Sequence, residues 1–471
     1  MEIKRTVNLY FKIFIDLLLL IVSVTIMLQP AIYNQYPLCH PDLLSYLSSG
    51  FDNIVHPFRP FFYGVIIRHI SMGYSLWFVI IFQAFIFSLT LYLVYRYVFR
   101  YKNSMLLTLI STAILSALTT VSFYTCHLIP DIYSGFGILA IILLLNTHKN
   151  HWLLTVYAVI LLIVSGLVHY SNIGAFNVII VLSFIFFIIF IRKDWNPFKF
   201  KQLVIPIVVV ISLWFLMPLL NFINGGPSRI TSNNEVIHMA RLIETGIASE
   251  YLHEKCEEHN YDLCNYLDYV DSRHHPSVFV WNYNDSPLYK GNCKDDDSCW
   301  EQKSKEYKLI INDMIKTAKY RNMIIWRIGI VGSFKQFVCI GHQPLQRQSK
   351  NTPGYMAMQK YFPNEFKKFN TSGQQSREWT TFKIRNIINR WAVIFGFIII
   401  VLFLIVKPLR KRLELSHYLF LSIVLLYLIV NAATCSVFSS ISPRYQDRII
   451  WLIPFSAILL LTNYLSISKE E

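Results

Sequence analysis

The chain has 471 residues, of which 54% are hydrophobic and only 15% are charged. Ordinary soluble domains carry about 25% charged residues, so this composition argues against a soluble enzyme and against a disordered protein. The net charge of +15 raises the question of nucleic-acid binding, which depends on where the basic residues lie.

Apolar windows of about 20 residues, long enough to cross a bilayer, recur along the whole sequence. Ten of them contain almost no charge, and we expect each to form a transmembrane helix. They predict an all-α integral membrane protein with about ten transmembrane helices. The predicted spans are 10–29, 74–95, 104–123, 131–147, 152–168, 174–191, 203–221, 391–407, 416–433 and 449–466.

The loops on the two sides of these spans differ strongly in charge. The short loops of one side carry 16 Lys and Arg residues and those of the other side carry 4, with the remaining 23 in the long segment 222–390. Loops rich in Lys and Arg stay in the cytoplasm, so both termini are predicted to be cytoplasmic. The basic excess is therefore a topology signal, and nucleic acid is not an expected partner.

The cysteines agree with this sidedness. All eight fall in outer loops or at the outer ends of spans, and disulfides belong to an oxidising compartment. The close pairs Cys256/Cys264 and Cys293/Cys299 are candidates for local bridges. No spacing of Cys and His typical of a structural zinc site is present.

Three parts follow from the order of the spans. Residues 1–221 form an N-terminal module of about seven spans, whose first outer loop covers 30–73. Residues 222–390 form a periplasmic domain, and residues 391–471 form a C-terminal module of about three spans.

The periplasmic domain opens on the turn signal NGGPSR and reads as mainly helical. Residues 233–258 have the spacing of a helix with one apolar face, and a second helical stretch covers about 304–338. Between them, Asp295 to Asp297 lie between two cysteines. This acidic cluster is either a site for a divalent cation or a solvated loop closed by a disulfide. The apolar face of the first stretch carries Val236, Ala240, Ile243 and Ile247.

Ionisable groups at the edge of a membrane are costly, so function is the first hypothesis for them. In the first outer loop, Asp42 follows a proline and precedes an amphipathic run. It is either a helix N-cap or a catalytic base for an attacking hydroxyl group. Arg59 precedes a second helical stretch, and its guanidinium either grips a lipid phosphate or snorkels at the interface. The nearby His40 and His56 are expected to be packed or solvated.

The next two outer connections are short. Asp131, in TCHLIPDIYSG, follows a proline at the start of a span, so it is either an N-cap or a substrate-binding carboxylate. His169, in VHYSNIG, is followed by Tyr170. Both side chains can donate a hydrogen bond to a phosphate or a sugar, and both can equally hold a turn.

The last outer loop, SSISPRYQDRIIWLIP, places Arg444, Tyr445 and Arg448 just before an apolar span. Residues four apart share a face of a helix, so Arg444 and Arg448 can converge on one phosphate or diphosphate. The alternative is an arginine paired with Asp447 that anchors the end of the span.

Several other classes of protein lack support in the sequence. No glycine-rich phosphate loop, nucleophile elbow or HExxH string is present, which disfavours an ATPase, a serine hydrolase or a zincin. Transporters tend to bury charged sites near the midplane and to show repeated halves. Here the polar groups gather at one face, and Asp16 is the one acid deep in a span.

Three short motifs together resemble the bacterial GT-C superfamily of polytopic glycosyltransferases, which use polyprenyl-phosphate-linked sugars. These motifs are PDLLSYL with FRPFFYG in the first outer loop, LIPDIYSG in the second and SPRYQDRIIWLIP in the last. The overall plan is also similar, with a cytoplasmic N-terminus, a long first outer loop containing interfacial helices and a large late outer domain.

The resemblance implies an inverting glycosyltransferase on the outer face of a bacterial inner membrane. The sugar would pass from a polyprenyl-phosphate carrier to a glycan, lipid or protein acceptor, with Asp42 as the base. Arg59, Arg444 and Arg448 would hold the donor phosphate. Asp131, His169 and Tyr445 are predicted to be further substrate-binding residues from their own positions in the outer loops. Many members have an adjacent acidic pair, whereas Leu43 follows Asp42 here, so a requirement for a divalent cation stays open and no metal ligand is assigned.

Two alternatives remain at this stage. One is an O-antigen-type polymerase or ligase, which uses diphosphate-linked donors. The other is a lipid or solute transporter.

Overall fold

The computed structural model describes residues 2–146, 151–191, 197–290, 296–376 and 381–467. These ranges contain helices and connecting loops but no β-strand, so the predicted all-α fold class is confirmed. One isolated parallel bridge joins Leu38 to His127. This bridge ties the first outer loop to the chain between the seventh and eighth helices.

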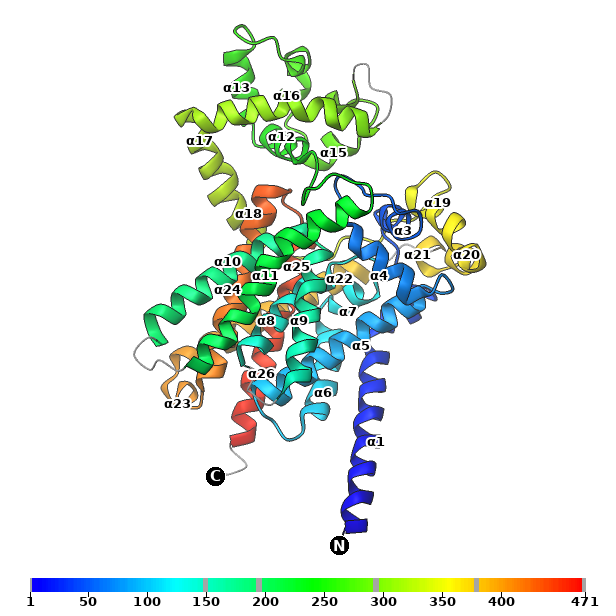
Figure 1. The fold of residues 1–471 in the computed structure, drawn as a ribbon, viewed down its shortest axis with the longest axis vertical. Helices are drawn as coiled ribbons and strands as arrows, with labels where there is room; N and C mark the ends of the chain where they lie inside the picture. The colour runs from blue at the N-terminus through cyan, green and yellow to red at the C-terminus, as the bar shows by residue number, and fades with distance from the viewer. Residues whose placement is uncertain (1, 147–150, 192–196, 291–295, 377–380, 468–471) are drawn as a thin grey trace.

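Helices from the two ends of the chain form one bundle (Figure 1). Both termini lie at the end of this bundle opposite to helices α12–α17, in agreement with an even number of crossings. The N-terminal helices are α1 (Glu2–Met27), α2 (Gln29–Asn34), α3 (Leu43–Asp52), α4 (Phe61–Ser71), α5 (Trp77–Leu93) with the π-helix η1 (Val94–Val98), α6 (Ser104–Leu118), α7 (Val121–Cys126), α8 (Ile132–Asn146), α9 (Trp152–Leu167), α10 (Tyr170–Ile191) and α11 (Pro197–Ile223). The C-terminal helices are α22 (Thr381–Ile405), α23 (Lys407–Arg410), α24 (Leu415–Phe438), α25 (Pro443–Ile450) and α26 (Leu452–Ile467).

Within the described ranges, six stretches are long and apolar enough to cross a membrane, which indicates a membrane protein. Four shorter apolar helices fall on the other four predicted spans, so the ten-span topology stays a prediction. The six long stretches are Tyr10–Met27, Trp77–Val98, Gln202–Ile223, Phe382–Ile405, Leu415–Phe438 and Pro443–Ser466. The four shorter ones are Ser104–Leu118, Ile132–Asn146, Trp152–Leu167 and Tyr170–Ile185.

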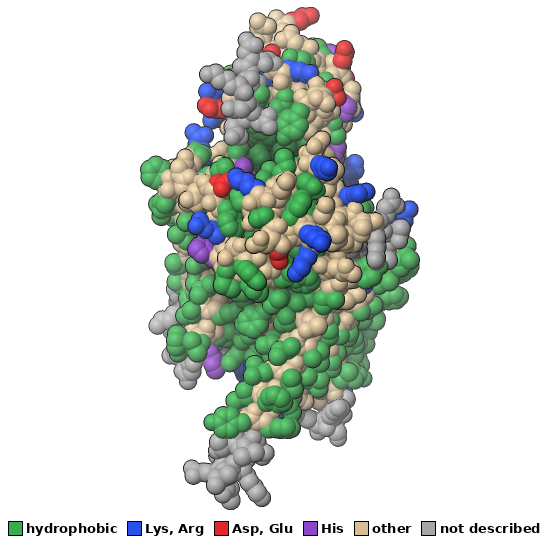
Figure 2. Space-filling view, turned by 90° about the vertical axis from the view of Figure 1, so that its right-hand side faces the viewer, with side chains coloured by type: hydrophobic (Ala, Val, Ile, Leu, Met, Phe, Trp, Pro, Cys, Tyr) green, Lys and Arg blue, Asp and Glu red, His purple; other side chains and the backbone are tan. Residues whose placement is uncertain are grey.

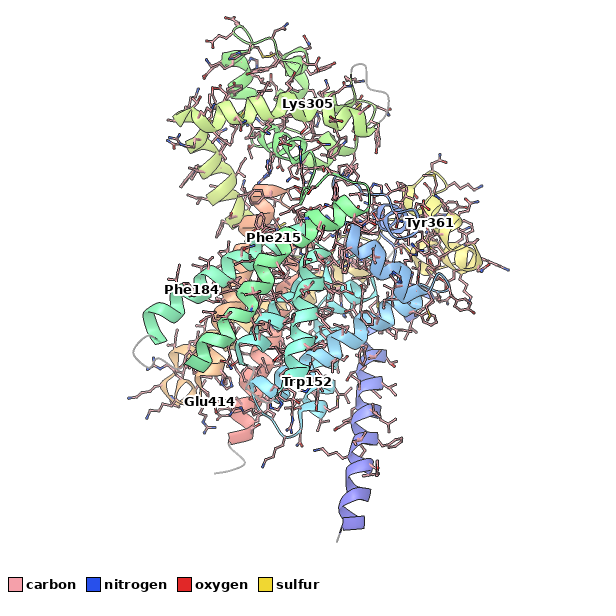
Figure 3. All side chains as sticks on the ribbon, viewed as in Figure 1. Trp152, Phe184, Phe215, Lys305, Tyr361 and Glu414 are labelled. Carbon is pink, nitrogen blue, oxygen red and sulfur yellow. A yellow bond between two sulfur atoms is a disulfide. The ribbon has the colours of Figure 1, made fainter. Side chains whose placement is uncertain are left out.

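Large apolar side chains cover the outside of the bundle. Figure 3 labels Trp152, Phe184 and Phe215 on three of its helices, and all three are exposed. Figure 2 shows an apolar lower half, whereas the charged side chains gather over the upper half. A continuous apolar surface of this size is expected where a protein meets lipid.

The two helical stretches of the first outer loop are α3 and α4, which pack tightly against each other. A Cβ atom on Gly50 would overlap the backbone carbonyl of Gly64, and one on Gly64 would overlap that of Tyr46. Glycine permits this close backbone approach. The glycine contact therefore fixes the two helices and the intervening loop that carries Arg59.

Segment 222–390 has two parts, whose buried apolar side chains belong to different cores. Its first part is a helical cap with its own apolar core, in which the four predicted face residues are fully buried. Gly246 adopts a left-handed conformation at φ +73°, which favours glycine and breaks the predicted helix 233–258 in two. The cap helices are α12 (Asn234–Glu244), α13 (Ile247–Lys255), α14 (Leu267–Asp271), α15 (Pro276–Trp281), α16 (Asp296–Lys316), α17 (Ala318–Met323), the π-helix η5 (Ile324–Val331) and α18 (Gly332–Val338).

The second part of the segment packs on the first outer loop. The buried carboxylate of Glu365 accepts hydrogen bonds from the hydroxyl groups of Tyr36 at 2.7 Å and Ser75 at 2.6 Å. The side chain of Gln374 binds the backbone N–H and carbonyl of Cys39. Such contacts link residues about 300 positions apart, so helical periodicity alone does not predict them. The helices of this part are α19 (Pro353–Tyr361), α20 (Pro363–Asn370) and α21 (Gly373–Ser376).

Candidate functional site

The predicted site residues meet on the side of the bundle that contacts the cap. They come from the first outer loop, from the turns before α8 and α10, and from α25. Gln336 of α18 donates a hydrogen bond to the carbonyl of Ser442, the residue before α25, at 2.9 Å. We call the following seven residues the arginine cluster: His40, Asp42, Arg59, Asp131, His169, Arg444 and Arg448.

Asp42 is the N-cap residue of α3 by position, as one interpretation of the sequence expected, but its side chain makes no capping hydrogen bond to that helix. Its Oδ1 accepts a hydrogen bond from the guanidinium of Arg59 at 2.6 Å. His40 and Arg444 approach Oδ2 at 3.3 Å and 3.5 Å, yet among the described residues this atom has no hydrogen-bond partner. Burial raises the pKa of Asp42, but Arg59, His40 and Arg444 outweigh burial and hold this pKa well below its usual value. Asp42 is therefore an ionised carboxylate in the free protein.

Asp131 is fully buried and joins two arginines of α25. Arg444 Nε donates to its Oδ2 at 2.6 Å, and Arg448 Nη1 donates to its Oδ1 at 3.0 Å. The two arginines share a helix face, as their spacing predicts. Neither pairs with Asp447, whose carboxylate has other partners. Asp447 accepts hydrogen bonds from Thr120, Tyr124 and Asn389.

The contact with Arg448 fixes the tautomer of His169. Arg448 Nη1 lies 2.6 Å from His169 Nε2, and a guanidinium has donors only. Nε2 is therefore the acceptor, and Nδ1 carries the proton toward Ser171 Oγ at 2.9 Å. Burial, followed by the charge of Arg448, lowers the pKa of His169 well below its usual value. Arg448 is held further by the side-chain oxygen of Asn431 at 3.1 Å.

The cluster has more guanidinium groups than carboxylates. It contains three guanidinium groups and two carboxylates, which leaves one guanidinium group in excess. The side chain of Arg448 is 0% exposed, that of Arg444 is 15% exposed and that of Arg59 is 26% exposed. A mostly buried site with excess positive charge attracts an anion, and Arg59 and Arg444 are the groups that an entering anion can reach.

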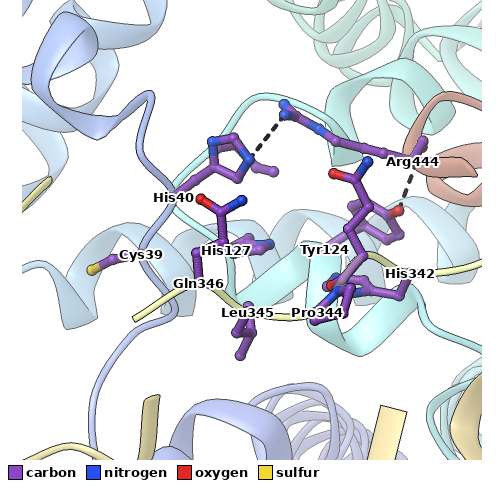
Figure 4. A pocket seen from close by; sticks show the side chains of 11 residues that line it. Cys39, His40, Tyr124, His127, His342, Pro344, Leu345, Gln346 and Arg444 are labelled. Carbon is purple, nitrogen blue, oxygen red and sulfur yellow. Dashed lines mark hydrogen bonds between the residues drawn. The ribbon is translucent and has the colours of Figure 1, made fainter. Parts of the chain in front are cut away.

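A small pocket adjoins the cluster at His40 and Arg444 (Figure 4). Its cavity is about 30 Å³, which exceeds the space of about 10–15 Å³ that one water molecule needs. The pocket is therefore sized for a water molecule or a hydroxyl group. We call it the histidine pocket, and it is lined by Cys39, His40, Tyr124, His127, Ile129, His342, Gln343, Pro344, Leu345, Gln346 and Arg444.

His127 is the orphaned polar group of this pocket. It is 4% exposed, and neither of its ring nitrogens has a hydrogen-bond partner among the described residues. Its ring centre lies 6.0 Å from that of His40 and 5.7 Å from that of His342. Burial lowers the pKa of His127 well below its usual value and that of His342 to about 4. Neutral imidazoles both donate and accept hydrogen bonds, so the pocket matches an uncharged hydroxyl group.

Tyr445 is the predicted site residue whose polar group turns away from the cluster. Its hydroxyl lies 2.9 Å from Ser439 Oγ. Its ring packs on the guanidinium of Arg448, with 5.6 Å between the guanidinium carbon and the ring centre. Tyr445 therefore contributes to the cluster through the position of Arg448.

The structure bears on the predicted metal and disulfide sites only in part. In the described part of the chain, no group of three His, Cys, Asp or Glu side chains could hold a metal ion. Asp295–Asp297 and Cys293 fall outside the residues whose side chains the structure describes. The other predicted bridge, Cys256–Cys264, is present.

Sequence reasoning missed four residues that shape the site. His40 was expected to be packed or solvated, but it contacts both Asp42 and Arg444. Asn431, His127 and His342 were not considered. A signal existed for His127, which is a polar residue in an apolar run directly before LIPD. None existed for His342, which enters from segment 222–390 through an irregular stretch.

The arrangement combines an anion-binding surface, an ionised carboxylate and a polar pocket at one edge of a membrane bundle. No protein-family model, curated protein or solved structure matches this chain. The arginine cluster and the histidine pocket are therefore the features of this protein that indicate a function.

Proposed function

We propose that the protein is an inverting glycosyltransferase that moves a sugar from a polyprenyl-phosphate carrier to an acceptor on the outer face of a bacterial inner membrane. The observation that carries this proposal is the arginine cluster, in which three guanidinium groups face two carboxylates at one edge of the bundle. The single excess charge matches the single negative charge of a phosphodiester-linked donor. A diphosphate-linked donor carries more charge, so the same balance favours the monophosphate class over a polymerase or ligase.

The donor phosphate would bind Arg59 and Arg444. Both guanidinium groups are partly accessible, and a guanidinium fits a phosphate through two parallel N–H bonds. Asp131 and Arg448 are less accessible. Arg448 holds the carboxylate of Asp131, and this carboxylate in turn holds Arg444 in position. The lipid tail would lie between the spans.

In the reaction, the acceptor oxygen attacks C1 of the sugar while the bond from C1 to the phosphate oxygen breaks. The electron pair of that bond leaves with the lipid phosphate, which the arginines stabilise as an anion. The proton of the acceptor hydroxyl passes to Asp42, whose Oδ2 has no hydrogen-bond partner among the described residues. No general acid is needed, since the leaving group is already an anion.

The bond from Arg59 makes Asp42 a weak base in the free protein, because it stabilises the ionised carboxylate. A donor phosphate that draws Arg59 and Arg444 toward itself would weaken this stabilisation. Its own negative charge would raise the pKa of Asp42 further. Donor binding would thus activate the base, so that proton acceptance begins only when the sugar is in place.

The cap and the histidine pocket would position the acceptor. Gln336 of the cap and Ser442 exchange two hydrogen bonds, at 2.9 Å and 2.8 Å, so the cap is joined directly to the helix that carries Arg444. His127 offers unpaired polar atoms beside the same arginine. A sugar hydroxyl group would satisfy them.

The test is turnover of polyprenyl-phosphate-linked sugars by the purified protein in lipid, followed as released lipid phosphate and new glycoside. Loss of a general base typically costs a factor of about 10²–10⁴ in rate, which is the loss expected for Asp42→Asn. Asp52→Asn is the matched control. Asp52 ends the same helix but bonds to Lys360 and Tyr361 outside the cluster, and turnover should be unchanged.

Equal turnover by wild type and Asp42→Asn would remove Asp42 as the base. Turnover with diphosphate-linked oligosaccharides alone would favour the polymerase or ligase. No turnover with either donor class, together with solute or lipid movement, would favour a transporter.

A further inference from the structure

A second cavity lies between α4 and α11, outside the arginine cluster. Its volume is about 280 Å³, far more than one water molecule needs and close to the lower end of the range of about 300–1,000 Å³ for small-molecule sites. We call it the α4–α11 cavity. It is lined by Gly50, Asn53, Phe61, Phe62, Val65, Arg68, His69, Leu220 and Asn224.

The walls of this cavity are apolar and its charged residues are basic. Phe62, Val65 and Leu220 provide the apolar surface, whereas Arg68 and His69 lie in the last turn of α4. No acidic side chain of the described residues lines the cavity. A bound cationic group would therefore find no partner, whereas a bound anion would find two.

Arg68 is held in place but keeps donors free. Its Nη1 donates to the carbonyl of Gly50 at 3.1 Å, and the close contact of Gly50 with Gly64 fixes that carbonyl. Within the described part of the chain, no carboxylate forms an ion pair with Arg68. A guanidinium has five N–H donors, so Arg68 can bind an anion while its anchor to Gly50 stays intact.

The cavity opens where the apolar surface of the bundle ends. Leu220 and Asn224 belong to the last turn of α11 and the residues directly after it, and the stretch Gln202–Ile223 is long enough to cross a membrane. Next to it, Phe222 and Ile223 are 64% and 66% exposed. This is the depth at which a lipid headgroup meets its acyl chains.

We propose that the α4–α11 cavity binds an anionic glycerophospholipid, with the phosphate on Arg68 and His69 and the first part of an acyl chain against Phe62, Val65 and Leu220. Because no described acidic side chain lines the cavity, a zwitterionic headgroup is disfavoured, since its ammonium group would lie beside the guanidinium of Arg68. This inference rests on the membrane position of the bundle and is independent of glycosyl transfer.

The phospholipid site is distinct from the proposed donor site. Arg59 precedes α4, whereas Arg68 lies near its end. Arg59 binds Asp42 in the cluster and does not line the cavity, whereas Arg68 lines the cavity and is anchored to the carbonyl of Gly50.

The experiment is lipid titration of the full-length protein in detergent, with bound lipid counted by native mass spectrometry. The probes are phosphatidylglycerol, phosphatidylcholine of the same chain length, polyprenyl phosphate and inorganic phosphate. Arg68→Gln removes the charge and should weaken phosphatidylglycerol binding about ten-fold or more. Val65→Trp should abolish this binding by filling the cavity. The control is Arg321→Gln, an exposed arginine of the cap, which should bind as wild type does.

Each outcome decides the proposal. Preferential binding of phosphatidylglycerol that is lost in both cavity variants and kept in the control supports it. Equal binding of phosphatidylcholine, equal binding by Arg68→Gln, competition by inorganic phosphate at similar affinity, or a site that takes polyprenyl phosphate alone would each overturn it. Since turnover is not measured, failure of this proposal is separate from failure of the proposed glycosyltransferase.

Discussion

The arginine cluster and the cap use charge in opposite ways. In the cap, most ion pairs, such as Arg327–Glu250 and Lys255–Glu258, lie at the surface around an apolar core, and the pair of the buried Arg241 with Glu244 is an exception. Exposed pairs of this kind are worth about 0–1 kcal/mol. In the cluster, the pair of Arg448 and Asp131 is fully buried, where desolvation is costly. The cap therefore folds by burial of apolar side chains, whereas the cluster keeps buried charges at a cost that the proposed binding of a substrate would explain.

The largest difference in stability is expected when one arginine is removed from the cluster and one from the cap. Arg448→Met leaves Asp131 buried with half of its partners, which should lower the free energy of unfolding by about 3–5 kcal/mol. Arg327→Met in the cap breaks a pair whose side chains are both 38% exposed and should cost at most about 1 kcal/mol. The measurement is denaturant unfolding of the purified variants in detergent.

The double variant Asp131→Asn/Arg448→Met is the internal control for this comparison. It removes the uncompensated charge, so it should be more stable than Arg448→Met alone. Equal losses for the two single variants would show that the buried pair is no more important than a surface pair.

The sequence predicted the residues of the cluster better than it predicted their contacts. Asp42, Arg59 and Arg444 stood out because charged residues are scarce in the short outer loops. The pairing of Arg444 with Asp131 did not stand out, because Asp447 is three residues away along the chain, whereas Asp131 lies in the turn before α8. Tertiary packing decides which charged residues pair, and neither the spacing nor the composition of the sequence predicts these pairs.

Prediction of the fold from the sequence has the same limit, because contacts between distant segments depend on tertiary packing. Hydropathy located the apolar helices, because the length and apolarity of a span are local properties. The division of segment 222–390 was missed, because Glu365 and Gln374 bind partners in the first outer loop. The four predicted face residues are buried, but they lie on two helices, because the predicted helix 233–258 ends before Gly246 and Ile247 begins α13. A single glycine was too weak a turn signal to predict this break.

A second prediction concerns the base of the cluster and its pH dependence. The pKa of Asp42 is depressed in the free protein, and donor binding should raise it. The acid limb of kcat/KM reports the free enzyme and that of kcat reports the complex. We therefore expect an acid limb of kcat within about pH 4–8, whereas the acid limb of kcat/KM lies about one unit or more lower. Initial rates measured from about pH 3 to pH 8 check this difference.

The variant Arg59→Gln tests whether Arg59 is the group that lowers the pKa of Asp42 in the free protein. Without Arg59, Asp42 is less stabilised as an anion, so the acid limb of kcat/KM should move up toward that of kcat. The same substitution at Arg321 of the cap should move neither limb. Coincident limbs in the wild type would contradict activation of Asp42 by donor binding.

The smallest effect is expected from the substitution His127→Phe, which tests whether His127 contributes to acceptor binding or to folding. His127 makes no hydrogen bond among the described residues, so His127→Phe removes no partner and should change stability by less than about 1 kcal/mol. If a sugar hydroxyl group satisfies the ring, loss of that bond costs about 0.5–1.5 kcal/mol, seen as a rise in KM of a few-fold to about ten-fold.

The control variant is His417→Phe, at the start of α24, where the imidazole takes part in a capping box. This variant should lose about 0.5–2 kcal/mol of stability and keep its KM. A stable His127→Phe protein with unchanged KM would show that the histidine pocket is packing beside the cluster, and the acceptor would then have to be held by the cap alone.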